Sequence, residues 1–104
     1  MMFDREKYIT SHANEILPVV LQITMWQCIE KWRVSKRKLD YLQVFKLSID
    51  RHDDRLVQVI EHSQEQPKQH EIIRIECDGY EPINEKVYVI DDGNYSTMIM
   101  SSDY

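Results

Sequence analysis

Residues 18–32, PVVLQITMWQCIEKW, repeat apolar side chains at helical spacing and decide the first half of the fold. Pro18 has no backbone N–H to donate, so it fits only the first turn of a helix. The regular helix is therefore predicted to begin between Asn14 and Leu17 and to run to about Arg37. Basic residues gather in its last turn, where positive charge interacts favourably with the helix dipole. The pattern predicts one long N-terminal helix.

The two tryptophans of this helix belong to different faces. Trp26 and Trp32 are six residues apart, which places them about 120° apart around the axis. Trp32 shares the predicted core stripe with Leu21, Met25, Cys28 and Ile29. Trp26 shares a second stripe with Val19 and Ile23 that this core does not explain. Val19, Ile23 and Trp26 are therefore a candidate protein interface, unless the amino-terminal arm covers them.

From Asp40 onward the apolar residues alternate as in strands rather than helices. Short segments rich in Val, Ile, Tyr and Thr predict five strands in series, at residues 41–49, 56–62, 72–77, 86–90 and 95–100. Residues 91–94 are the clearest hairpin turn, and such short links favour antiparallel pairing. Leu42 and Val44 make the first of these strands apolar on both sides, which predicts a central strand covered on both faces. Residues 7–10 are β-prone and predict a small strand or an extended arm.

A helix followed by a run of strands predicts an α+β fold, with one long N-terminal helix packed on a mainly antiparallel sheet of about five strands. The 104 residues suit a single domain spanning 1–104. Cys28 and Cys77 lie in apolar patterns and are predicted to be buried free thiols. The chain has no run of 18 apolar residues and no secretion-type amino terminus, so we expect a cytoplasmic protein with no membrane contact.

The net charge of -5 is unevenly distributed along the chain. Residues 1–38 hold 7 basic and 4 acidic side chains, whereas residues 39–104 hold 6 and 14. The acidic part repels phosphate, which disfavours direct nucleic-acid binding. It also suggests an alternative hypothesis, in which an acidic inhibitor mimics nucleic acid and occupies a DNA-processing enzyme. That hypothesis requires carboxylates arranged in a double row rather than scattered over the fold.

Residues 61–71 are the densest polar stretch and contain the candidate polar hairpin site, formed by Glu61, His62, Gln64, Glu65 and His70. If His62 and His70 converge in a hairpin, they and adjacent glutamates offer ligands for zinc or groups for catalysis. The spacing matches no metal signature, however, and the 2 glycines exclude Gly-rich cofactor loops. A solvated hairpin is favoured, and no catalytic, cofactor-binding or metal residue is assigned.

Several strings resemble the staphylococcal family, found in Firmicutes, known as domain of unknown function 960: residues 7–10 (KYIT), 40–47 (DYLQVFKL), 64–67 (QEQP) and 97–100 (TMIM), together with Leu21-Gln22 ahead of Trp26. The resemblance implies a small cytoplasmic protein, with relatives on chromosomes, phages and mobile cassettes. It implies no activity, cofactor or catalytic residue. The chain departs from the family pattern at Lys68-Gln69, where an aromatic residue is expected, so an aromatic-lined contact at this hairpin is in doubt.

Together these observations favour a small noncatalytic protein-interaction or accessory protein associated with mobile elements. Its partner would be another protein or a second copy of the chain. The acidic mimic and the site around His62 and His70 remain the two alternatives, and the sequence identifies no partner.

Overall fold

The computed structural model describes residues 2–104 and contains one sheet with two helices. In chain order the elements are β1 (Lys7–Ile9), α1 (Ser11–Ile16), α2 (Val19–Val34), β2 (Leu42–His52), β3 (Arg55–Glu65), β4 (Lys68–Glu76), β5 (Glu85–Asp91), β6 (Ser96–Met100) and a final 3₁₀ turn (Ser101–Asp103). No helix in this described part of the chain is long and apolar enough to cross a membrane.

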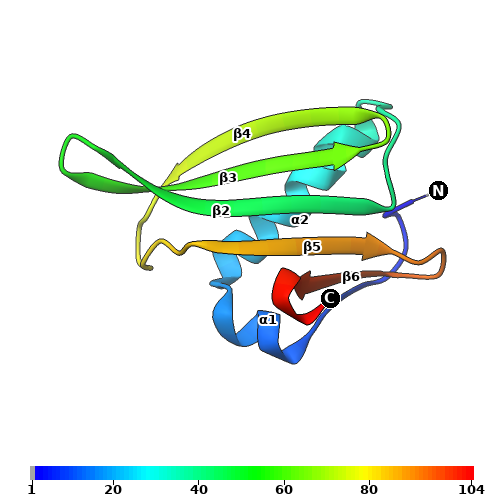
Figure 1. Cartoon of the computed structure of the whole chain (residues 1–104), viewed down its shortest axis with the longest axis horizontal. Coiled ribbons are helices and arrows are strands. Elements are labelled where there is room, and N and C mark those ends of the chain that lie inside the picture. Colours follow the sequence, from blue (N-terminus) through cyan, green and yellow to red (C-terminus); the bar gives the residue numbers. More distant parts are fainter. Residues whose placement is uncertain (1) are drawn as a thin grey trace.

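The sheet has six strands in the order β1-β6-β5-β2-β3-β4 (Figure 1). The α+β class is confirmed, and so is antiparallel pairing from β6 to β4. The expected count of five strands is wrong, because β1 joins the sheet as a sixth strand parallel to β6. Its partner lies almost 90 residues away, with Ile9 opposite Met98, and no local pattern can predict such a pairing.

The predicted single N-terminal helix is also wrong in detail, because β1 and α1 precede the long helix. Thr10 caps α1 by accepting a hydrogen bond from the Ala13 amide at 3.2 Å. Pro18 is the N-cap of α2 rather than a residue of its first turn, and its carbonyl accepts the Leu21 and Gln22 amides. The helix ends at Val34, short of the expected end.

The strand β2 is central, between β5 and β3, as its sequence predicts. Cover on both faces is not observed, because α2 packs on only one face of the sheet (Figure 1). Phe45 and Leu47 are buried on the helix side, whereas Leu42 and Val44 are half-buried on the open side. The turn to β3 is shorter than expected and contains only Asp53 and Asp54, both at positive φ, as tight hairpins require.

The core lies between α2 and the sheet. Trp32 is 1% exposed, and the other four residues of its predicted stripe are buried as well, which confirms that face of the helix. The amino-terminal arm adds Phe3 to the core. Its backbone amide donates to the Asp91 carboxylate at 2.7 Å, so the arm is fastened to the end of β5.

Candidate functional site

The face of α2 that points away from the sheet is apolar and exposed. Val19 is 65% exposed, Val20 44% and Ile23 51%, and Trp26 beside them is half-buried. We call these four residues the α2 surface. No charged residue occurs from position 16 to position 29. A solvent-facing helix usually carries charged or polar residues on its outer side, so this helix is apolar on more sides than its own core explains.

The amino-terminal arm covers Trp26 only in part. A shallow cavity of about 400 Å³ lies between the arm and the helix, and it is lined by Phe3, Asp4, Lys7, Ile23, Trp26, Gln27, Glu30 and Arg33. The Lys7 ammonium lies 5.8 Å from the centroid of the Trp26 ring, within cation–π range. Trp26 is therefore neither fully covered by the arm nor fully exposed. One side of its ring packs on the core, and the other side faces this cavity.

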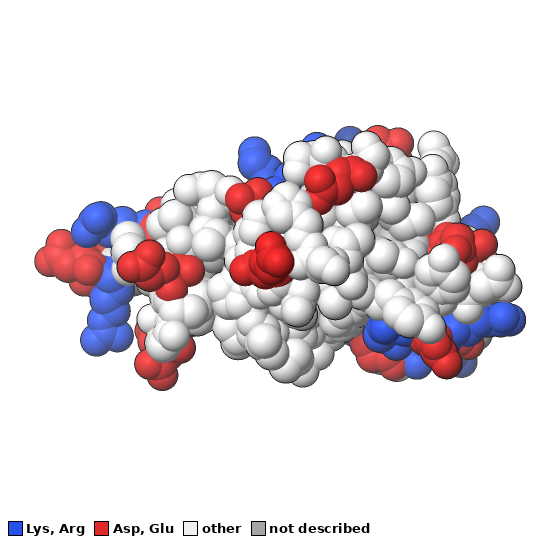
Figure 2. Space-filling model, turned by 90° about the horizontal axis from the view of Figure 1, so that it is seen from below, with Lys and Arg blue, Asp and Glu red and all other residues white. Residues whose placement is uncertain are grey.

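Seen from the side of α1, the middle of the face in Figure 2 is largely uncharged and bears a few separate acidic residues, whereas residues of both charges gather at the two ends and basic residues also lie along the upper margin.

The C-terminal end of α2 is held to the sheet through Glu71 of β4. Its carboxylate accepts bonds from Lys31 Nζ at 2.5 Å, Trp32 Nε1 at 2.8 Å and Arg37 at 3.3 Å. These donors, Lys31 first, lower the pKa of Glu71 to about 2. The basic last turn of the helix thus has a specific anionic partner besides the helix dipole.

His62 is buried beneath the same end of the helix. Its ring stacks between Trp32, at 3.8 Å between centroids, and Phe45, at 4.4 Å. The ring Nε2–H donates to Gln43 Oε1 at 2.6 Å, because the Gln43 amide nitrogen is itself a donor to Asp40 and Gln64. Nδ1 has no hydrogen-bond partner among residues 2–104. Burial lowers the pKa of His62 to about 3, so the ring is neutral at pH 7.

The candidate polar hairpin site does not converge. Strands β3 and β4 do form a hairpin, but His62 and Gln64 point to the helix side, whereas Glu61, Glu65 and His70 lie on the other face. The structure brings together only Glu61 and His70, whose atoms lie 2.9 Å apart. Strand alternation puts neighbouring residues on opposite faces, which explains the separation. Within residues 2–104 no group of three potential ligands is placed to hold a metal ion.

Gln64 is buried, although the sequence predicts a solvated hairpin there, and the buried Gln58 was not identified from the sequence. Gln64 Nε2 donates to the carbonyls of Lys38 and Pro67, which fastens the segment after α2 to the β3–β4 turn. Gln58 bonds both the amide and the carbonyl of Ile83, at 2.8 and 3.0 Å. The alternation of inward and outward residues along β3 could have identified them, because Gln58 and Gln64 both occupy inward positions.

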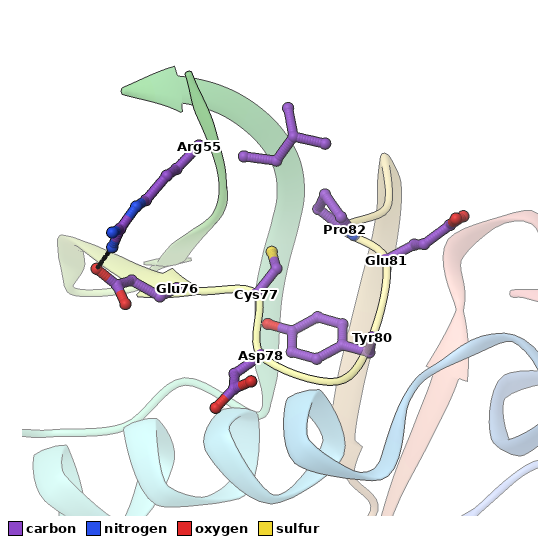
Figure 3. A pocket seen from close by; sticks show the side chains of 8 residues that line it. Arg55, Glu76, Cys77, Asp78, Tyr80, Glu81 and Pro82 are labelled. Carbon is purple, nitrogen blue, oxygen red and sulfur yellow. Dashed lines mark ion pairs between the residues drawn. The ribbon is translucent and has the colours of Figure 1, made fainter. Parts of the chain in front are cut away.

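A second cavity, of about 600 Å³, lies where β4 ends (Figure 3). It is lined by Cys77, Tyr80 and Pro82, by three acidic residues, and by Arg55. The Tyr80 hydroxyl is buried without a hydrogen-bond partner in the described chain, and burial raises its pKa to about 12. Cys77 is half-buried rather than buried as expected, because it follows the last residue of the strand. Cys28 is buried, as predicted.

Two acidic pairs that bear on the double row required of a nucleic-acid mimic are far apart. Asp53 and Asp54 form the β2–β3 turn at one end of the sheet, whereas Asp91 and Asp92 lie at the β5–β6 turn at the opposite end (Figure 1). The Glu30 carboxylate accepts hydrogen bonds from Arg33 on the same helix, so it belongs to neither pair. These carboxylates do not share a row.

The family described as Staphylococcal protein of unknown function (DUF960) matches residues 6–103. The chain belongs to this family. DUF960 carries no assigned activity, so membership confirms the resemblance and leaves the function to be inferred from the structure.

The DUF960 fold recurs in a crystal structure of a protein of unknown function from Enterococcus faecalis. The two share 20% sequence identity with a TM-score of 0.76, and the match covers 100% of this chain and 96% of the other. At that identity the likeness concerns the fold alone. No curated protein matches the sequence.

Proposed function

We propose that this DUF960 protein acts by binding another protein through the α2 surface. The observation that carries the proposal is the exposed apolar face of a helix that has no charged residue from position 16 to position 29. Exposed Val and Ile side chains on adjacent turns lose about 25 cal/mol of favourable burial free energy for each Å² left in water. Such a contiguous patch is typical of an interaction site.

The surroundings of Trp26 support the same proposal. Interfaces commonly have an aromatic anchor near a pocket and a charged rim. Here Trp26 and Ile23 line the cavity beside the arm, and Lys7, Glu30 and Arg33 form its charged rim. A partner that fits would insert one apolar side chain into the cavity and lay an apolar helix or strand over Val19.

Affinity purification from native cells tests the proposal, with wild-type protein and the double variant Val19→Asp/Ile23→Asp as baits. Both sites are exposed, so the variant should fold, which circular dichroism checks. The control is Leu56→Asp, which places one carboxylate at an apolar residue that is 43% exposed and lies on the β2–β3 hairpin rather than on α2. We expect one stoichiometric protein to bind the wild type and the control and to be lost from the double variant. A bound protein retained by the folded double variant contradicts the proposal.

A further inference from the structure

The strand β4 forms an open edge of the sheet. It pairs with β3 over its whole length, from Lys68 opposite Glu65 to Glu76 opposite Val57, and it is the last strand in the sheet order. Figure 1 shows it at the margin of the sheet, with most of α2 behind the sheet and only the C-terminal end of α2 reaching the start of β4. A nine-residue edge presents a row of backbone N–H and C=O groups that can pair with another strand.

The residues of β4 stand in a self-complementary order. When two copies of this strand pair antiparallel along their full length, the two-fold axis passes through Ile72. Each Lys68 then lies opposite the Glu76 of the other copy, so the dimer gains two ion pairs. Ile72, which is 44% exposed in the single chain, lies against its own copy at the centre.

We propose that two copies of this chain associate through β4 and form a continuous twelve-stranded sheet. This inference does not depend on the proposed function of the α2 surface. Its occupant follows from charge order. Among antiparallel registers that keep helix-side residues opposite helix-side residues and pair at least half of the strand, only the full register places opposite charges across from each other.

Other pairings are disfavoured by the same charges. In a parallel in-register pair, Lys68 meets Lys68 and Arg74 meets Arg74, and like charges directly opposite each other are destabilising. A shift of two residues in one direction brings Lys68 opposite Arg74. A shift in the other direction moves Lys68 beyond the end of the partner strand. A shift of one residue would place helix-side residues opposite residues of the other face. Among registers that keep like faces together, the charged edge therefore favours the full register and discourages indiscriminate strand addition.

The remaining side chains of β4 are compatible with this register. Arg74 lies opposite His70 of the second copy, and His70 is hydrogen-bonded to the Glu61 carboxylate, so an acidic group stands nearby. On the helix side, Glu71 lies opposite Ile73, but its carboxylate is already bonded to Lys31 and Trp32 of its own chain. No unpaired carboxylate is buried at this contact.

The arrangement places both α2 helices on the same side of the combined sheet. Antiparallel pairing about an axis perpendicular to the sheet matches each face with the same face of the other copy. The C-terminal ends of the two α2 helices would lie nearest the dimer axis. The two α2 surfaces would then face the same way on either side of the axis, so a partner that is itself dimeric or repetitive and spans both would bind with increased avidity.

Charge exchange tests the register directly. We expect sedimentation equilibrium of the wild type to show a concentration-dependent dimer. Lys68→Glu and Glu76→Lys each place like charges opposite each other at both ends, so each should raise the dimer Kd at least about tenfold. An equimolar mixture of the two variants restores both opposite-charge pairs and should form a heterodimer, and the double variant Lys68→Glu/Glu76→Lys should recover the wild-type Kd.

Three controls make the result specific. Lys46→Glu, which reverses an exposed charge on the central strand β2, should leave the Kd unchanged. Val19→Asp/Ile23→Asp should also leave it unchanged, which separates this dimer from any contact through α2. Thermal unfolding verifies that each variant folds. A wild type that is monomeric at about millimolar concentration overturns the proposal. So does a dimer whose Kd is indifferent to the single exchanges, or a mixture that fails to associate better than its components.

Discussion

Acidification from pH 7 to pH 5 should destabilise the protein through His62 alone. Burial between two aromatic rings lowers the pKa of folded His62 from the ordinary 6.5 to about 3. The charge of Glu71 opposes this shift, and that of Arg37 adds to it. Because the unfolded state binds this proton more readily, the stabilising contribution is present above pH 6.5 and is lost as the pH falls toward 3. Each pH unit in that window costs about 1.36 kcal/mol, so the loss by pH 5 is about 2 kcal/mol.

The other carboxyl and histidine groups with shifted pKa values can be separated from this effect. Hydrogen bonds lower the pKa of Glu30 and of Asp92, so the contributions of these two carboxyls fall only below their ordinary values of 4.5 and 3.8. The pKa of Glu71 is lowered to about 2, so its contribution begins to fall only below the ordinary value of 4.5. The carboxylate of Asp103 raises the pKa of His12, so its contribution has the opposite sign and increases on acidification. When every sample carries the substitution His12→Gln, the contribution of His12 to the pH dependence of stability is absent from the comparison.

Urea unfolding at pH 7, 6 and 5 measures the effect, with His62→Phe as the comparison variant. Phe retains a ring in the stack and cannot titrate, although it leaves Gln43 Oε1 without its donor at a cost of about 1–3 kcal/mol at every pH. We expect the free energy of unfolding of the parent to fall by about 2 kcal/mol between pH 7 and 5, equivalent to roughly 10 °C in Tm, and that of the variant to stay flat. Equal slopes in the two proteins would refute the assignment to His62.

Three further predictions concern the other buried or clustered groups. Glu71→Gln should cost about 1 kcal/mol at pH 7, measured by urea unfolding, and its difference from wild type should shrink as the pH falls from 4.5 toward 2, since stability from a carboxyl with a lowered pKa is lost in that window. Gln58→Leu should cost about 1–3 kcal/mol and speed hydrogen exchange at the Ile83 amide, whose acceptor it removes; unchanged exchange would contradict this role. At pH 8, iodoacetamide should modify Cys77 well before Cys28, because burial raises the Cys28 pKa to about 11; mass spectrometry that finds Cys28 labelled first would exclude this order.

The parts of the fold that could be predicted from the sequence are those encoded by local periodicity. The helical stripe located Trp32 in the core, and alternation located all five strands from β2 to β6. The parallel pair of β1 and β6 could not be predicted, because it joins the two ends of the chain and β1 has only three residues. Long-range pairing depends on the assembled sheet rather than on any sequence window.

Some residues of the candidate site could likewise be predicted from local spacing, and others could not. The exposed positions of Val19 and Ile23 agree with the second stripe, because angular position around a helix follows directly from spacing. The polar hairpin was misleading because composition suggested a solvated loop, whereas His62 and Gln64 occupy inward positions of a long strand. The open edge at β4 could not be predicted from the sequence, because the order of strands in a sheet does not follow from their order in the chain.

The buried polar groups matter to the exposed surface as well as to stability. Glu71 fixes the C-terminal end of α2, and Gln22 donates to the Leu17 carbonyl at its N-terminal end. Gln64 holds the segment that leaves the helix. Side-chain hydrogen bonds therefore fasten both ends of α2, and its outward face is fixed in position without using any of the exposed apolar residues. A surface held in this way loses little conformational entropy on binding, so a larger share of the free energy of burying Val19 and Ile23 is left to hold a partner.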